Sequence, residues 1–329
     1  MKALITGGTG FLGRHLANRL QQLDYEVTVL GRNKTIGMDL AQKGFRFIRA
    51  DLRDSCQINQ AIAGMDYVFH CGALSTPWGR FPDFFAINVK GTENVINGCL
   101  VHGVRRMIHI SSPSIYFEYR HKFNVTESHP LPSRMVNNYA KTKYLAEERI
   151  DAAFSAGLPV ITLRPRALFG PGDTSIFPRL IMANQKLGIP MIDNGEVLMD
   201  LTYVENAVEA IVLAIDSPPA TLGKKYNISN GTPVPFKSLL EELFSKLGLT
   251  LRTRNISFSS AYLGAYFLET FYKTFLPKKE PPFTCYSVGT LSKTITLDIS
   301  AAKMELGYNP GISIEKGLEL FVNGWKEKP

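Results

Sequence analysis

The chain has 329 residues, and its 45% hydrophobic and 20% charged content is that of an ordinary globular protein of one or two domains. The formal net charge of +8 suits an anionic cofactor or an acidic membrane surface. The basic residues are dispersed, however, and clusters as short as Lys224-Lys225 argue against a nucleic-acid partner.

The four cysteines and six histidines do not stand at the spacings of a metal site. Cys56, Cys71, Cys99 and Cys285 form no C-x-x-C pair, and no H-x-x-x-H pattern occurs. We therefore expect no bound metal, and we expect reduced thiols. The N-terminus begins directly with a strand-like segment and lacks a charged-then-apolar signal sequence. Together these features predict a cytoplasmic protein.

The first predicted element is a strand over Lys2–Thr6, which glycines and an amphipathic helix follow at once. The text ITGGTGFLGRHL fits both G-x-x-G-x-x-G and G-x-G-x-x-G. Such loops turn tightly and let a pyrophosphate approach the backbone N–H groups at the positive end of the helix dipole. An ordinary strand-to-helix turn is the alternative. The residues predicted to bind a dinucleotide here are Gly7, Gly10, Phe11, Leu12 and Gly13.

The second predicted strand, Glu26–Leu30, ends in Gly31-Arg32-Asn33, without the acidic residue that holds the ribose of NAD. Arg32 could pair with a 2′-phosphate, which favours NADP over NAD. The alternative is that Arg32 stacks on the adenine of either cofactor. The third strand, Phe45–Arg49, and the fourth, Tyr67–Cys71, should bring further cofactor-binding residues to the same edge of the sheet: Asp51, Leu52, Cys71, Gly72 and Ala73.

Two more strands, Met107–Ser111 and Val160–Arg164, alternate with helical stretches such as Phe84–Val101. This alternation predicts an α/β fold with a Rossmann-type, doubly wound parallel sheet. After Pro165 the pattern becomes less regular. We expect a dinucleotide-binding domain over residues 1–165 and 201–228. A smaller, discontinuous substrate-binding region should comprise residues 166–200 and 229–329.

Tyr139 and Lys143 stand four residues apart in NNYAKTKYLAEERI, downstream of serines at 111, 112 and 114. On a helix this spacing puts the phenol and the ammonium on one face. A nearby ammonium lowers the pKa of a tyrosine toward neutrality, which makes the phenol a usable acid and base. A serine hydroxyl could orient the reacting oxygen. The alternative, a solvated helix face, is weakened by the glycine loop upstream.

The stretch from Phe258 to Leu276 is crowded with tyrosine and phenylalanine and carries only two charges. It is short and interrupted for a spanning helix, which needs about 20 apolar residues. It could lie in a membrane interface beside Lys278 and Lys279, wall a lipid-sized pocket, or pack as an ordinary helix. Of the two functional alternatives, we favour the pocket wall.

With these motifs in place, nearly the whole chain resembles an extended short-chain dehydrogenase/reductase. More narrowly, four segments resemble the 3β-hydroxysteroid dehydrogenase branch of the epimerase/dehydratase superfamily: FHCGALSTPWG, INVKGTENVI, SSPSIYF and LRPRALFGPGD. By this resemblance Tyr139 is the acid and base, and Lys143 lowers its pKa and holds the nicotinamide ribose. Ser112 orients the substrate and Asn88 supports a water chain. The residues expected to line the nicotinamide are Pro165, Ala167 and Leu168.

The resemblance implies an NAD(P)-dependent oxidoreductase that interconverts a secondary alcohol and a ketone on an apolar substrate, either sterol-like or a β-hydroxy or β-keto acyl lipid. Pro113-Ser114 replace the Asp-Glu of sugar dehydratases, and Phe117 replaces the glycine of many sugar epimerases. A nucleotide-sugar 4-epimerase with tightly bound NAD remains an alternative, as does a non-catalytic dinucleotide-sensing protein. Peripheral membrane contact, a homodimer, the exact substrate and the direction of reaction stay open.

Overall fold

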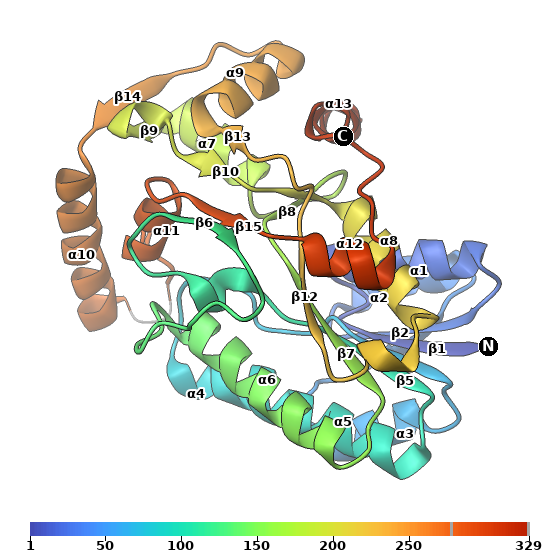
Figure 1. Ribbon diagram of the computed structural model, residues 1–329. Coiled ribbons are helices and arrows are strands. Elements are labelled where there is room, and N and C mark those ends of the chain that lie inside the picture. Colours follow the sequence, from blue (N-terminus) through green and yellow to red (C-terminus); the bar gives the residue numbers. More distant parts are fainter. Residues whose placement is uncertain (277–278, 328–329) are drawn as a thin grey trace.

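A seven-stranded sheet forms the centre of the computed structural model, which describes residues 1–276 and 279–327 (Figure 1). The strand order is β12-β7-β5-β4-β1-β2-β3, and every neighbouring pair is parallel. The predicted α/β fold with a doubly wound parallel sheet is therefore confirmed. The strands are β1 (Lys2–Thr6), β2 (Glu26–Gly31), β3 (Arg46–Arg49), β4 (Tyr67–His70), β5 (Arg106–Ile110), β7 (Val160–Pro165) and β12 (Lys225–Ile228).

Helices cover both faces of this sheet, so its inner strands are apolar on both sides, as expected for parallel strands. On one face lie α1 (Phe11–Gln22), α2 (Lys34–Gln42), α8 (Val204–Ile215) and α12 (Ser300–Leu306). On the other lie α3 (Ser55–Ile62), α5 (Gly91–His102) and α6 (Asn138–Ser155). The strand order reverses between β1 and β4, and ligands of such sheets bind at this point.

The helix predicted over Phe84–Val101 is not uniform. α4 (Phe81–Phe84) leads into a π-helical stretch, η1 (Phe85–Lys90), before α5 begins at Gly91. A π turn accommodates an extra residue, and such turns are frequent at functional sites. Here the π turn carries Asn88.

A second region covers one end of the sheet. It contains four two-stranded pairs, and its apolar cluster includes Phe177, Phe236 and Phe321. The paired strands are β6 (Lys122–Val125) with β15 (Ile295–Leu297), β8 (Leu168–Phe169) with β11 (Thr202–Tyr203), β9 (Ile189–Ile192) with β14 (Thr253–Ile256), and β10 (Leu198–Met199) with β13 (Val234–Pro235). The main helices here are α7 (Phe177–Lys186), α9 (Phe236–Leu247) and α13 (Ile314–Lys326).

The aromatic stretch forms α10 (Phe258–Phe275), which stands at the left edge of the molecule beside α11 (Cys285–Thr290) (Figure 1). One side of α10 packs through Ala265, Phe258 and Tyr262. The opposite side carries exposed apolar side chains: Leu263, Tyr266, Phe267, Phe271 and Phe275. Lys278, which the sequence analysis named beside this segment, lies outside the described residues.

Candidate active site

The glycine loop forms the turn between β1 and α1, and two of its glycines are sterically required. Gly7 has a φ of +69°, and a Cβ there would lie 2.7 Å from the backbone of Gly72. A Cβ on Gly13 would lie 2.4 Å from the carbonyl oxygen of Gly7. Gly10 precedes the first turn of α1, where Phe11 and Leu12 begin the helix. The loop therefore leaves a side-chain-free cradle at a helix N-terminus, which fits a pyrophosphate.

A cavity of about 280 Å³ adjoins this cradle at the carboxyl edge of the sheet. Asp51 does not stand free there, because its carboxylate accepts hydrogen bonds from the Arg53 guanidinium at 2.8 and 2.9 Å. This hydrogen bonding lowers the pKa of Asp51 to about 2. Arg53 was not foreseen from sequence. The predicted cofactor residues that line this single cavity are Gly7, Gly10, Arg32, Asp51, Leu52, Cys71, Gly72 and Ala73.

Tyr139 lies in the first turn of α6, and the hydroxyls of Ser112 and Ser75 lie beside its phenol. Ser112 follows β5 and caps the short 3₁₀ helix at residues 113–116, where its Oγ accepts from the Ser114 N–H at 3.2 Å. The structure thus brings the predicted serine and tyrosine together. Ser75 was missed because nothing in its local sequence shows that the loop after β4 reaches the start of α6.

Lys143 is buried, and its ammonium donates to the carbonyl oxygen of Ile110 at 2.7 Å. Burial lowers the pKa of Lys143 to about 8, while Glu147 and Cys71 act in the opposite sense. Burial raises the pKa of Tyr139, and the hydrogen bonds from Ser75 and Ser112 offset this only in part. The ammonium of Lys143 is directed at a backbone carbonyl, and its lowering of the Tyr139 pKa stays a prediction.

Asn88 is buried in the π turn, and its side chain joins two parts of the site. Its Oδ1 accepts from the Leu74 N–H at 2.7 Å, and its Nδ2 donates to Thr142 Oγ1 at 3.1 Å. Thr142 in turn donates to the Tyr139 carbonyl at 3.1 Å. Asn88 therefore fixes the β4 loop against α6 next to both Tyr139 and Lys143. This arrangement makes it a positioning residue, and its support of a water chain stays a prediction.

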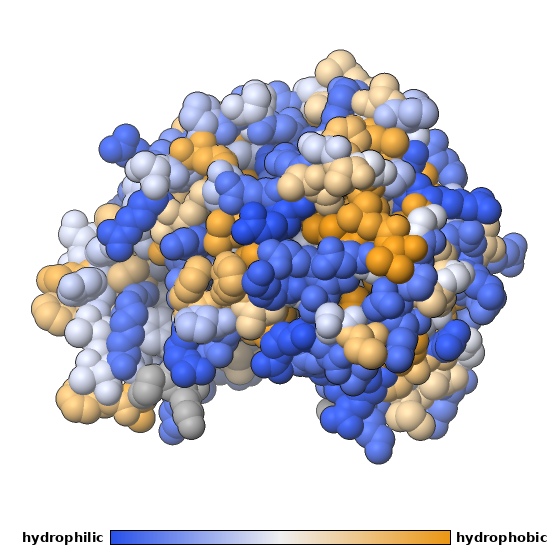
Figure 2. Space-filling model, turned by 90° about the horizontal axis from the view of Figure 1, so that it is seen from below, coloured by the Kyte–Doolittle hydropathy of each residue, from blue (hydrophilic) through white to orange (hydrophobic). Residues whose placement is uncertain are grey.

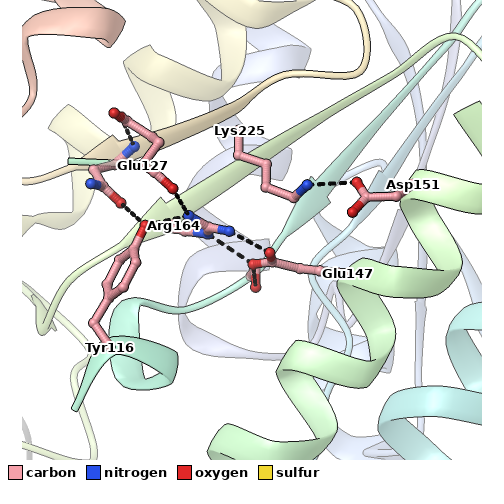
Figure 3. A network of polar contacts seen from close by, with 8 residues as sticks. Tyr116, Glu127, Glu147, Asp151, Arg164 and Lys225 are labelled. Atoms are coloured by element: carbon pink, nitrogen blue, oxygen red, sulfur yellow. Dashed lines mark hydrogen bonds and ion pairs between the residues drawn. The ribbon is translucent and has the colours of Figure 1, made fainter. Parts of the chain in front are cut away.

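A buried ion pair lies one turn beyond Lys143 (Figure 3). Glu147 pairs with Arg164 of β7 at 2.5 Å, and their side chains are only 3% and 4% exposed. Glu147 also accepts from Ser111 Oγ at 2.5 Å, and Arg164 donates to the phenol oxygen of Tyr116. These contacts tie α6, β7 and the end of β5 together directly behind Ser112 and Lys143. The two charges compensate each other, as a buried pair requires.

A second, larger cavity of about 650 Å³ opens next to Ser112. Its walls are mostly apolar and come from separated segments, which include α7, Phe236 and Leu239 of α9, and residues 280–291. No residue of α10 belongs to this lining, so the expectation that Phe258–Leu276 walls the pocket is wrong for this cavity. Beyond α10, the described part of the chain contributes to the cavity again from Glu280 onward.

The segment after β7 lines this cavity through Arg166 and Ala167, and its expected contact with the nicotinamide stays a prediction. Pro165 ends the strand, Ala167 lines the cavity, and Leu168 begins β8. Ala167 has a φ of +45°, a strained conformation for a residue with a Cβ. Such strain persists where the surrounding structure holds it, which is frequent at ligand sites.

Residues 3–229 match the model of a family described as the NAD dependent epimerase/dehydratase family. The chain belongs to this family. It is 35% identical to a 2-alkyl-3-oxoalkanoate reductase of Stenotrophomonas maltophilia, with 97% of each chain covered. It is 32% identical to a mouse sterol-4-alpha-carboxylate 3-dehydrogenase, decarboxylating, with 98% of this chain and 91% of the relative covered.

Among solved structures, UDP-glucuronic acid 4-epimerase of Bacillus cereus in complex with NAD superposes with a TM-score of 0.79. It covers 99% of both chains at 22% identity, a likeness that shows the shared fold. The family and its named relatives make this chain an extended short-chain dehydrogenase/reductase of the 3β-hydroxysteroid dehydrogenase-like branch. It is an oxidoreductase that uses a nicotinamide dinucleotide and acts on a small-molecule substrate.

Proposed function

We propose that the protein interconverts a ketone and a secondary alcohol on an apolar, lipid-like substrate with Ser112, Tyr139 and Lys143 as its catalytic residues. The observation that carries this proposal is the Ser112 hydroxyl, which lies beside the Tyr139 phenol and lines a mostly apolar cavity. The cofactor, when bound, supplies or accepts the hydride. Tyr139 gives the proton to the substrate oxygen or takes it back, and Ser112 holds that oxygen by a hydrogen bond.

Lys143 has two further tasks in this proposal. On cofactor binding its ammonium would exchange the Ile110 carbonyl for the nicotinamide ribose and come to bear on Tyr139. An added positive charge near the phenol favours the phenolate and lowers the pKa of Tyr139 toward the working pH. Glu147 and Arg164 hold α6, which carries this lysine, against β7, and Glu147 also binds Ser111 next to the catalytic serine.

We propose NADP as the preferred cofactor, with Arg32 as the residue that recognises its 2′-phosphate. Arg32 is exposed at the rim of the smaller cavity, and the nearby Asp51 is already neutralised by Arg53. A 2′-phosphate would therefore meet one unpaired guanidinium and little repulsion. We further propose that residues 1–165 and 201–228 form the dinucleotide-binding domain, and that the remainder binds substrate.

The substrate class follows from the cavity and from the relatives' names. Both names place the reacting carbon at position 3 of a carboxylate-bearing apolar skeleton, either an alkanoate or a sterol. A β-keto acyl or sterol-like lipid is accordingly favoured. A sugar nucleotide fits less well, because apolar side chains such as Ile176, Leu180 and Met199 line the cavity.

A panel of substrates tests this proposal. The purified protein is incubated with NADPH or NADH and a 3-oxo fatty acid, a 3-oxo steroid or a UDP-sugar, and cofactor oxidation is followed optically. Net NADPH consumption with a lipid ketone is the expected result. Interconversion of UDP-sugars without net consumption would instead establish the epimerase alternative. A protein that binds cofactor but turns over none of the panel would contradict the proposal.

Peripheral membrane contact is a second proposal, and the exposed face of α10 favours it. Figure 2 shows hydrophobic side chains along the left edge of the molecule, where α10 lies. Phe267 and Phe275 are 63% and 68% exposed. Rings of this kind enter the acyl boundary of a bilayer, and nearby cations such as Lys273 and Lys279 attract anionic headgroups. Among the described residues, no helix has the length and apolar character needed to span a membrane.

Sedimentation with vesicles tests the membrane proposal. The wild type should sediment with anionic vesicles at low salt and less at high salt. Phe267→Ser should sediment less while unfolding at nearly the same temperature, because an exposed substitution changes stability by only about 0.5 kcal/mol. If the wild type stays in the supernatant with anionic and neutral vesicles alike, α10 does not bind membranes.

A further inference from the structure

One charged side chain in the larger cavity is not used by the mechanism above. Arg166 follows β7 and lines the cavity together with Ser112. Its Nε is buried without a hydrogen-bond partner, and no carboxylate of the described residues approaches its guanidinium within ion-pairing distance. Burial lowers the pKa of Arg166 and nearby Asp200 raises it, but a guanidinium remains protonated at neutral pH. Arg166 thus has a counter-charge in Asp200 but no hydrogen-bonded anionic partner, and its place in the cavity lining lets it bind one.

The Ser114 hydroxyl is a second unpaired donor in the lining of the same cavity. Ser114 lines the cavity, and its Oγ is buried without a hydrogen-bond partner. Its backbone N–H donates to Ser112 Oγ, so it stands within one short turn of the residue that binds the reacting oxygen. Tyr286 also lines the cavity and interacts electrostatically with both Arg166 and Tyr139. Arg166, Ser114 and Tyr286 are therefore gathered at the end of the cavity that holds Ser112.

We propose that Arg166 and Ser114 form an anion subsite that binds a carboxylate of the substrate close to the reacting carbon. The substrate is then a 3-oxo or 3-hydroxy acid whose apolar body extends along α7 and α9. A carboxylate fits because the planar guanidinium donates two parallel hydrogen bonds, and the serine hydroxyl can donate a third. The mostly apolar walls beyond this end fit an alkyl or ring body rather than a polyanion. This assignment rests on the proposed ketone and alcohol chemistry.

The test compares an acid with its neutral ester. Wild type and Arg166→Leu are assayed with NADPH on 3-oxododecanoate and on methyl 3-oxododecanoate. Wild type should prefer the acid in kcat/KM by about 10- to 100-fold, the factor expected of charge-assisted hydrogen bonds. Arg166→Leu should lose this preference, mainly through KM for the acid, while its activity on the ester is kept. Arg166→Lys should restore part of the preference, and Ser114→Ala should reduce it less.

Arg179→Leu is the matched control, because Arg179 also lines the cavity but is paired with Glu280 at 2.9 Å. It should leave the ratio of acid to ester unchanged. Equal use of acid and ester by the wild type would overturn the subsite and leave the proposed ketone chemistry standing. The subsite would also be overturned if Arg166→Leu lost activity on acid and ester equally and Ser114→Ala left the ratio of acid to ester activity unchanged.

If neither compound is turned over, the proposed function is contradicted, and a binding measurement then tests the anion subsite by itself. Dodecanoate and 1-dodecanol are then titrated calorimetrically into wild type and Arg166→Leu with saturating NADP. Tighter binding of dodecanoate by the wild type alone supports the subsite. Equal binding of both compounds, or the same preference in Arg166→Leu, overturns it.

Discussion

The two cavities of this enzyme are built by different means. The smaller one, at the glycine loop, is shaped by absent side chains, and the residues that form it follow the ends of β1 to β4 in chain order. The larger one is shaped by side chains from segments as distant as Ser112, Ile176, Phe236 and Tyr286. Backbone geometry therefore shapes the proposed cofactor site, whereas side-chain packing shapes the proposed substrate site.

The largest expected effect lies at Tyr139, beside Ser112 of the larger cavity. Tyr139→Phe removes only the phenol oxygen, so turnover should fall by about 10²- to 10⁴-fold while cofactor binding is retained. Steady-state rates and calorimetric titration with NADPH check this. Tyr144→Phe, on the same helix and partly exposed, is the control. Wild-type turnover in Tyr139→Phe would show that another group moves the proton.

The buried pair behind the site should matter mainly for stability. Glu147→Gln leaves Arg164 as an uncompensated buried charge, and breaking such a pair costs about 3–5 kcal/mol of unfolding free energy. Asp151, on the same helix as Glu147, forms a partly exposed ion pair with Lys225 of β12. Asp151→Asn breaks this pair and should lower the unfolding free energy by only about 0.2–1 kcal/mol. Denaturant unfolding of both variants measures the difference. Equal losses of unfolding free energy in the two variants would mean that burial does not make the Glu147–Arg164 pair more important for stability.

Two arginines near the smaller cavity should differ in their effect on cofactor affinity, because only one of them is already paired with a carboxylate. Arg32→Ala should weaken NADPH binding by about 1.5–3 kcal/mol and hardly affect NADH, because only NADPH carries a 2′-phosphate. Arg53→Ala should affect both cofactors alike, since this guanidinium is already paired with Asp51. Titration of each variant with both cofactors checks this. Equal losses of NADPH and NADH affinity in Arg32→Ala would remove the 2′-phosphate role.

The smallest effect is a pH dependence in the cofactor-free protein. Lys143 has a pKa of about 8 when folded and an ordinary, higher pKa when unfolded. Between pH 8 and 10 the unfolded chain therefore binds more protons at this site, and its contribution to stability rises with pH. The rise is at most about 1.4 kcal/mol per pH unit. Wild type should gain stability relative to Lys143→Met over this range, and a constant difference would contradict the lowered pKa.

Sequence correctly predicted that Gly7, Arg32 and Asp51 would lie at one edge of the sheet, because each follows the end of a predicted strand. The fold followed from the same alternation of strands and helices. The larger cavity could not be predicted, since Arg166 and Ser114 converge only after the sheet and the second region have packed. The direction of the Lys143 ammonium was missed for a related reason: its acceptor is a backbone carbonyl, which has no signature in sequence. The exposure of one side of α10 could not be predicted either, because it depends on how residues 280–291 pack against this helix.

The π turn that carries Asn88 also makes the chain sensitive to its own length. Each residue of a regular helix advances the chain by about 100° around the axis. Deleting one residue within η1 would restore a regular helix, and the side chains inside the former π turn would then point in different directions relative to α5. Asn88 could then no longer face both Leu74 and Thr142. Between Phe85 and Lys90, the number of residues is therefore expected to be more constrained than their identities.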